Sequence, residues 1–186
     1  DEYLIHDLKM QGAAIDSWGV GTNLITSKDC PSFGGVYKLA AIEDAEGNVI
    51  PKIKVSENPS KVTTPHFKKV WRIFEQESDK AIADLITVYD EPMDETKPLE
   101  LFDPDAVWKR ETVERYRAEE LLRSIFKSGE LVYDLPDIET IRAYCARQIE
   151  RQWDEVKRFE NPHNYYVDLS QKLWDIKADL LQQAKA

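Results

Sequence analysis

The sequence predicts a mixed α/β fold, or an α+β fold for the chain taken alone, and three patterns support this. Apolar residues recur at helical spacing over residues 2–11, and a short apolar run with a glycine turn follows over 13–21. Over residues 36–89 the apolar spacing changes to a period of two, which is typical of β-strands. Spacings of three and four return over residues 138–158 and indicate a helix.

The first of these patterns has the order of an α/β unit. Leu4, Ile5 and Leu8 share one helical face, and Gly12 stands where a glycine commonly ends a helix. The next residues, "AAIDSWGVG", predict a short strand that runs into a glycine turn. A helix, a strand and a loop at the carboxyl end of that strand form the repeating unit of α/β proteins.

The middle of the chain predicts a small, largely antiparallel β region. The runs "GVYKLAAIED" and "VIPKIKVSE" are separated by Glu46-Gly47-Asn48, which predicts a hairpin. A second hairpin is expected from "KVWRIFEQ" and "AIADLITVYD". Residues 90–106 contain three prolines and many acidic residues, so we expect a surface linker there.

Ser128-Gly129 predicts one more hairpin, whereas residues 107–120 fit either strands or the start of a helix. Farther on, Asp137 is a suitable N-cap for a long amphipathic helix over residues 138–158. Asn161-Pro162 would end that helix.

A last helix is expected after Ser170, which would be its N-cap. Leu169 and Trp174 occupy the two positions of a hydrophobic staple around that cap. The chain is therefore expected to end in a helical region.

The net charge of −10 lies entirely within residues 75–186 and disfavours nucleic acids and anionic membranes as partners. Residues 52–72, in contrast, hold six Lys or Arg against Glu57 alone. This segment suits either an anionic small molecule or a solvated strand face with lysines. No apolar run approaches the length of a membrane helix, so we expect a cytoplasmic protein. The first residue is Asp rather than Met, which suggests a piece of a longer protein.

The glycine turn itself has two interpretations. Only seven glycines occur in the chain, and two of them stand in "GVGT" at residues 19–22. Such a turn can hold a phosphate, since missing side chains let backbone amides converge on the anion and the hydroxyl of Thr adds a donor. It can equally be a plain tight turn, because it matches neither a Walker loop nor the longer dinucleotide fingerprint.

Several segments together resemble a known family. They are "IDSWGVGTNLITSKDCPSFGGVYKLAAI", "PKIKVSENPSKVTTPHFKKVWRIF", "KAIADLITVYDE" and "RFENPHNYYVDLSQKLWDIKADLL". In this order they are similar to the C-terminal part of the nicotinate phosphoribosyltransferases, and the resemblance extends over nearly the whole chain.

The resemblance implies an enzyme of NAD salvage that converts nicotinate and phosphoribosyl pyrophosphate to nicotinate mononucleotide and pyrophosphate, coupled to ATP hydrolysis. ATP and magnesium are implied, a prosthetic group is not, and a homodimer of the full-length chain is expected. The implied fold is an irregular α/β barrel of the type II phosphoribosyltransferases with a smaller domain. Residues 1–29 would close the barrel with the phosphate loop. Residues 30–106 would form the antiparallel β region and linker, and residues 107–186 a hairpin and the C-terminal helices.

The resemblance also suggests roles for residues. Gly19, Gly21 and Thr22 would hold the 5′-phosphate at the barrel mouth. Asp16 and Ser17 would orient this loop or touch the ribose, or serve structure alone. Cationic contacts to phosphates or pyrophosphate are expected from three further residues, namely Lys61, Lys68 and Arg72.

No catalytic residue is assigned within this chain. The family's reactive histidine lies in an upstream barrel segment, and His6, His66 and His163 are not expected to replace it. His66 follows Pro65 where the family is expected to have Gly, and His163 is expected to pack or cap. We therefore expect the chain alone to be inactive. The alternatives are a non-enzymatic module that binds phosphate or supports assembly, and an enzyme acting on another pyridine or purine base.

Overall fold

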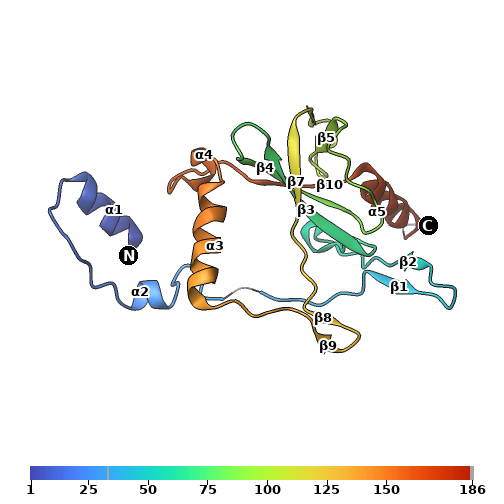
Figure 1. The fold of residues 1–186 in the computed structure, drawn as a ribbon, viewed down its shortest axis with the longest axis horizontal. Helices are drawn as coiled ribbons and strands as arrows, with labels where there is room; N and C mark the ends of the chain where they lie inside the picture. The colour runs from blue at the N-terminus through green and yellow to red at the C-terminus, as the bar shows by residue number, and fades with distance from the viewer. Residues whose placement is uncertain (33, 185–186) are drawn as a thin grey trace. The chain divides into compact units, whose positions relative to one another are not determined.

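The computed structural model divides the chain into two units, Asp1–Tyr37 and Lys38–Ala186 (Figure 1). It describes residues 1–32 and 34–184. The first unit contains two short helices, and the second contains the described strands together with three α-helices. No helix in these described residues is long and apolar enough to cross a membrane.

The first unit begins with the predicted helix, α1 (Glu2–Met10). The Asp1 carboxylate caps it by accepting a hydrogen bond from the Leu4 amide at 3.0 Å. Beyond the last turn Gly12 has a φ of +80°, a backbone conformation that glycine adopts without steric cost. Its amide donates to the Lys9 carbonyl at 3.0 Å. The predicted helix and its terminal glycine are thus confirmed.

The strand predicted directly after this helix is absent. Residues 13–20 have no regular structure apart from a bend, and the short helix α2 (Thr22–Ile25) follows them. A strand needs a neighbour that accepts and donates its backbone hydrogen bonds. The described residues of the first unit contain no second strand, so the apolar run has nothing to pair with.

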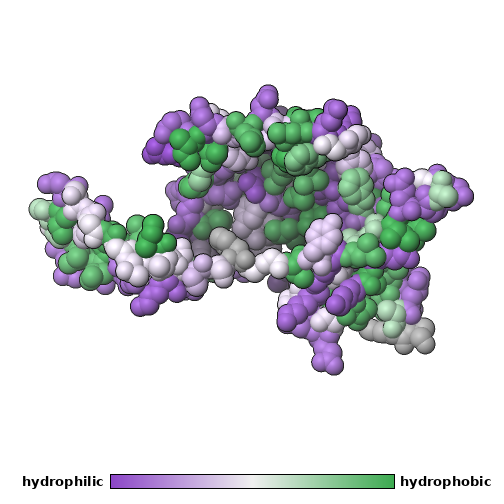
Figure 2. Space-filling model, turned by 90° about the horizontal axis from the view of Figure 1, so that it is seen from below, coloured by the Kyte–Doolittle hydropathy of each residue, from purple (hydrophilic) through white to green (hydrophobic). Residues whose placement is uncertain are grey.

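The first unit has no core of its own. None of its described residues is buried. Most large apolar side chains of α1 and α2 are exposed, namely Tyr3, Leu4, Met10, Leu24 and Ile25. Green apolar surface is accordingly plain on this unit in Figure 2. Because burial of apolar surface is the main stabilising contribution in folding, this unit has little stability of its own.

The second unit is built on a four-stranded sheet with the order β10-β4-β3-β7. Its strands are β3 (Lys68–Glu75), β4 (Ala81–Val88), β7 (Tyr116–Glu120) and β10 (Tyr166–Leu169). The β3–β4 pair is the predicted hairpin, and β7 adds antiparallel to β3. β10, which the sequence did not predict, pairs parallel with β4. The sheet therefore joins strands from both of the segments 30–106 and 107–186.

The two faces of this sheet carry different cores. On one face Ile73, Ala83 and Leu85 pack with Leu101 and Tyr116. Leu101 belongs to a hairpin that covers this face, formed by β5 (Leu99–Phe102) and β6 (Arg110–Val113). The run 90–106 is therefore only partly the surface linker that its prolines and acids predicted. Its residues 99–102 form the strand β5, and Leu101 and Phe102 of this strand are buried.

The other face of the sheet is covered by the last helix, α5 (Gln171–Gln183), which packs against β4 and lies to the right of the sheet in Figure 1. Val88, Leu169 and Leu173 form the core there, and Trp174 packs against them. The Ser170 hydroxyl accepts from the Leu173 amide at 3.3 Å, so the predicted N-cap is confirmed. Trp174 packs against the cluster that contains Leu169, as the predicted staple requires.

Two smaller hairpins also agree with the sequence. They are β1 (Ala41–Glu43) with β2 (Val49–Pro51), and β8 (Phe126–Lys127) with β9 (Glu130–Leu131). Ser128 and Gly129 both have positive φ, as a two-residue hairpin turn of type I′ requires. A 3₁₀ turn, η1 (Pro59–Lys61), lies between β2 and β3.

The predicted helix over residues 138–158 is broken in two. It forms α3 (Ile138–Glu150), capped by Asp137 as predicted, and α4 (Asp154–Lys157). The break has a tertiary cause at Arg151. Its carbonyl accepts from the Ala81 amide at 2.8 Å, and its guanidinium pairs with Asp79 at 3.0 Å. These bonds tie the chain to the start of β4. The ambiguous residues 107–120 form strands β6 and β7.

The core between α5 and the sheet predicts a large effect of Leu173→Ala. Leu173 is fully buried, so the truncation is expected to lower the free energy of unfolding by about 2–5 kcal/mol. Urea unfolding followed by tryptophan fluorescence measures it. Leu24→Ala is the matched control, since Leu24 is 65% exposed and the change should stay within about 0.5 kcal/mol. Equal effects of the two truncations would contradict this assignment of the core.

Candidate functional site

The residues of the predicted phosphate loop lie together in the first unit, at the start of α2. Gly21 is the N-cap of this helix, and its carbonyl accepts from the amides of Leu24 at 3.2 Å and Ile25 at 3.3 Å. The Thr22 carbonyl accepts from the amide and the hydroxyl of Thr26, at 3.0 and 2.6 Å. The loop is therefore a short hydrogen-bonded turn, and Gly19, Gly21 and Thr22 are exposed on it.

The structure of the unit does not itself account for glycine at position 19. A Cβ at Gly19 would meet no atom within 4 Å, and the φ of Gly19 is not left-handed. Asp16 and Ser17, just upstream, are exposed as well. These loop residues are free of packing against their own unit, so the surface they form is open to a ligand or to another part of a larger protein.

The three predicted cationic residues lie in the second unit and have different surroundings. Lys61 is exposed at the end of η1, and its ammonium has no ion-pair partner among the described residues. Lys68 is half-buried, and its ammonium donates to the carbonyls of Thr64, Pro65 and His66 at 2.9, 3.2 and 2.7 Å. Burial lowers the pKa of Lys68. The Lys68 ammonium thus closes the loop of residues 64–66.

His66 stands where the resemblance predicted a glycine, and its backbone explains that expectation. Its φ is +78°, in the region that side chains seldom adopt. The imidazole Nδ1 accepts from the amide of Phe67 at 3.0 Å, and the Lys68 ammonium holds the His66 carbonyl. The position therefore keeps a backbone typical of glycine although histidine occupies it.

Arg72 is already paired within the sheet. Its guanidinium donates two hydrogen bonds to Asp84, at 2.8 and 2.9 Å, and the Tyr165 hydroxyl donates to the same carboxylate at 2.8 Å. The hydrogen bonds to Asp84 raise the pKa of Arg72. Tyr165 also lies with its ring 5.8 Å from the guanidinium carbon. Lys68 and Arg72, which are predicted to contact phosphate, therefore both already bind groups of this chain.

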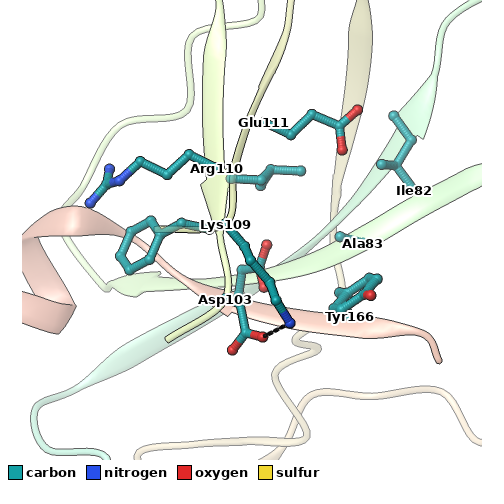
Figure 3. Close-up of a pocket in the computed structure, with 10 residues that line it drawn as sticks. Ile82, Ala83, Asp103, Lys109, Arg110, Glu111 and Tyr166 are labelled. Carbon is teal, nitrogen blue, oxygen red and sulfur yellow. Dashed lines mark ion pairs between the residues drawn. The ribbon is translucent and has the colours of Figure 1, made fainter. Parts of the chain in front are cut away.

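A pocket of about 240 Å³ opens in the second unit between the sheet and the β5–β6 hairpin (Figure 3). One wall comes from β4 and β10, and the other comes from β5, β6 and the loop between them. The lining residues combine apolar, aromatic and charged side chains: Ile82, Ala83, Leu101, Phe102, Asp103, Lys109, Arg110, Glu111, Tyr166 and Asp168.

Asp168 is the unusual residue of this pocket. It is 5% exposed, and its carboxylate makes no hydrogen bond or ion pair with any described residue. Burial raises the pKa of Asp168 to about 6, and the nearby charges of Asp103 and Glu111 add to the shift. A buried carboxylate normally has a cation or hydrogen-bond donors beside it. The only signal for Asp168 in the sequence is an acid within the apolar run "YVDL".

The two cations of the pocket are engaged elsewhere. The Lys109 ammonium lies 3.7 Å from Asp103, as the dashed line in Figure 3 marks. Arg110 pairs with Glu100, donates to the Gln171 side chain at 3.1 Å, and stacks over Phe102. In Figure 3 its side chain extends away from Ile82 and Tyr166. Neither cation neutralises Asp168.

The chain is similar in sequence to known proteins. Residues 67–177 match the family model described as the nicotinate phosphoribosyltransferase C-terminal domain. Nicotinate phosphoribosyltransferase of Bacillus subtilis is 42% identical over 186 residues, which is 100% of this chain and 38% of that protein. The Homo sapiens protein of the same name is 30% identical over 174 residues, which is 93% of this chain and 31% of the relative.

A solved structure is similar as well. The crystal structure of human nicotinic acid phosphoribosyltransferase superposes with a TM-score of 0.58 at 25% sequence identity, covering 63% of this chain and 23% of that one. The chain thus spans 38% or less of the length of these relatives.

The raised pKa of Asp168 predicts that Asp168→Asn stabilises the protein in a pH-dependent way. The carboxyl has a pKa of about 6 when folded against an ordinary value of 3.8, so the folded protein binds more protons between these pH values. The stability contribution of Asp168 therefore falls as the pH rises through this window. Asn stays neutral, so the substitution should raise the free energy of unfolding by about 1–3 kcal/mol at pH 8 and by far less at pH 4.

Urea unfolding at both pH values tests this prediction. Asp134→Asn is the control, because Asp134 is exposed and loses the same charge. A loss of stability in Asp168→Asn at pH 8, or an equal gain at both pH values, would contradict the assignment.

Proposed function

Because this chain belongs to the nicotinate phosphoribosyltransferase family, through its C-terminal domain, we propose that it is the C-terminal part of an enzyme of NAD salvage. The enzyme joins nicotinate to the ribose of phosphoribosyl pyrophosphate and releases pyrophosphate, with ATP hydrolysis coupled to the transfer. The observation that carries this proposal is the 42% identity to a nicotinate phosphoribosyltransferase along the whole chain.

The chain acts, in this proposal, packed against the remainder of the enzyme. The first unit buries none of its described residues, which supports this view. The amphipathic helix α3 gives further support, because Ile138, Ile141, Tyr144 and Ile149 along it are all exposed. Burial of such apolar surface against a partner stabilises the protein, because the surface is removed from water.

The enzyme is proposed to be a cytoplasmic homodimer that binds neither nucleic acid nor membrane.

The loop at the start of α2 is proposed to hold the 5′-phosphate of the ribose substrate. Gly19 lets the backbone approach the phosphate closely, and Gly21 and Thr22 place amides and a hydroxyl beside it. Asp16 and Ser17 orient this loop or touch the ribose. The open space around Gly19 supports the proposal, since a group from outside the unit has room to bind there.

The three cationic residues are proposed to have different roles in binding phosphate. Lys61, with its exposed ammonium, is the residue of the three that is available to contact a phosphate or pyrophosphate oxygen. Lys68 and Arg72 are proposed to act through the loop and the sheet that they hold in place, given the partners they already have. The reactive histidine of the family is expected in the part of the relatives that this chain does not cover.

ATP and magnesium are proposed as requirements of the full-length enzyme. Among the described residues, no three His, Cys, Asp or Glu side chains converge as metal ligands would. Magnesium is proposed to enter with the phosphates of the substrates, because this ion is usually bound through phosphates and one or two carboxylates.

The phosphate loop predicts a specific defect for Thr22→Val in the full-length enzyme. Valine keeps the shape of threonine but removes the hydroxyl donor, and a hydrogen bond to a charged group contributes about 1.5–3 kcal/mol. The KM for phosphoribosyl pyrophosphate should rise by roughly 10-fold to 100-fold, while the KM for nicotinate changes little. Steady-state kinetics with each substrate varied in turn measures this.

Thr112→Val is the matched control, because Thr112 is exposed on β6 in the second unit. Unchanged kinetics in Thr22→Val would show that the hydroxyl does not bind the phosphate.

The isolated chain, assayed with nicotinate, phosphoribosyl pyrophosphate and magnesium ATP, should show no turnover. Turnover above background would overturn the proposal that catalysis needs the rest of the enzyme.

A further inference from the structure

The four-stranded sheet contains two buried aspartates, of which one has hydrogen-bond and ion-pair partners among the described residues and the other has none. Asp84 on β4 is 9% exposed and Asp168 on β10 is 5% exposed. In the parallel pairing Asp84 stands opposite Val167, whereas Asp168 stands opposite Leu85. Because side chains alternate along a strand, the two carboxylates lie on opposite faces of the sheet.

Asp84 shows how this sheet satisfies a buried carboxylate. A guanidinium binds it through two nitrogen atoms, and Tyr165 supplies both a hydroxyl donor and a ring near the cation. Bidentate binding of this kind is among the stronger hydrogen-bonding arrangements in proteins. The guanidinium comes from Arg72, which stands opposite Asp84 on β3.

Asp168 has the same burial without those partners. No described residue donates a hydrogen bond to it or forms an ion pair with it. It lines a pocket of about 240 Å³ whose other carboxylates are Asp103 and Glu111. Lys109 and Arg110, the cations of the pocket, are paired with Asp103 and Glu100. The pocket therefore has room for a positively charged group and a buried carboxylate to receive it.

The lining favours an organic cation over a metal ion. No three ligating side chains converge on a point anywhere in the described chain. The walls instead offer apolar surface from Ile82, Ala83 and Leu101, and the Tyr166 ring stands at the edge of the pocket in Figure 3. A guanidinium group is planar, weakly hydrated, binds a carboxylate in bidentate fashion and stacks on aromatic rings.

We propose that the pocket beside Asp168 is a binding site for a guanidinium group, carried by a small molecule or by an arginine side chain of a peptide. Asp168 accepts its hydrogen bonds, and the Tyr166 ring lies beside the bound cation. The site shares no residue with the proposed phosphate loop, and its existence does not depend on the proposed transferase activity.

Binding is expected to depend on pH through Asp168. The charged or titratable groups that face it are Asp103, Lys109, Arg110 and Glu111 from the β5–β6 side and Tyr166 from its own strand, while β4 contributes only apolar side chains. Asp168 must be ionised to pair with the cation, and its pKa is about 6. Affinity should therefore rise about tenfold between pH 5 and pH 7.5.

The experiment titrates the whole chain with methylguanidinium chloride and follows backbone amide shifts by NMR. Saturable shifts at β10 and β6 are expected, with a dissociation constant on the order of 1–10 mM at pH 7.5. Methylurea is the neutral analogue of similar shape, and sodium chloride at matched concentration accounts for ionic strength. An arginine-containing peptide, and the same peptide with citrulline in place of arginine, form the second arm.

Asp168→Asn should abolish the saturable shifts, and Asp134→Asn, which removes an exposed charge elsewhere, should keep them. Saturation by methylguanidinium points to a small-molecule ligand, and saturation by the arginine peptide alone points to a peptide ligand; both support the proposal. The proposal is overturned if neither probe saturates, if methylurea or the citrulline peptide binds as well as its charged counterpart, or if Asp168→Asn binds like the parent chain.

Discussion

The parallel pairing of β10 with β4 is the contact on which the rest of the second unit depends. It brings Tyr166–Leu169 beside a strand more than 75 residues earlier in the chain. The Ser170 amide continues the ladder by donating to the Ile86 carbonyl at 2.9 Å, and Ser170 then caps α5. One short strand thus fixes the start of the helix that covers one face of the sheet. It also sets Asp168 into the pocket on the other face.

The helices of the first unit and α3 differ from α5, because their apolar side chains are largely exposed. They form where local signals place them, with Asp1 and Asp137 as caps, yet their apolar faces remain exposed. Local capping can start a helix, but most of the stability of a short helix comes from packing. This chain spans 38% of the length of its Bacillus subtilis relative, and such faces suit the proposed packing against the remainder of a longer enzyme. The proposed phosphate loop lies in the same first unit, so its final geometry depends on that packing as well.

The sequence predicted the elements whose cause is local. Hairpins with Gly47 and Gly129 at the turn, and the caps Asp137 and Ser170, need only a few neighbouring residues, and all are present. The predictions that were wrong concern long-range contacts. The strand after α1 has no partner in its unit, and the long helix is broken where Arg151 binds the start of β4. β10 was missed because four residues give too weak a pattern without knowledge of the strand beside them.

The site residues show the same division. Lysines and arginines are visible in the sequence, but their partners are not. The bond of Arg72 to Asp84 follows only from the structure, and the contact of Arg72 with phosphate stays a prediction. Asp168 was missed because its importance rests on burial and on missing partners, and both follow only from the sheet. The proposed roles of Gly19, Gly21 and Thr22 rest on family resemblance together with the open surface of their loop.

The second unit folds through its own sheet, whereas the first unit is proposed to need the remainder of a longer enzyme. Amide hydrogen exchange, measured on the isolated chain and on the full-length enzyme, tests it most directly. Slow exchange is expected for β3, β4 and α5 in both proteins. Residues 1–37 should exchange at nearly unprotected rates in the isolated chain and at least about 100-fold more slowly in the full-length enzyme. Strong protection of residues 1–37 in the isolated chain would show that the first unit folds alone, and rapid exchange of the sheet would show that the second unit does not.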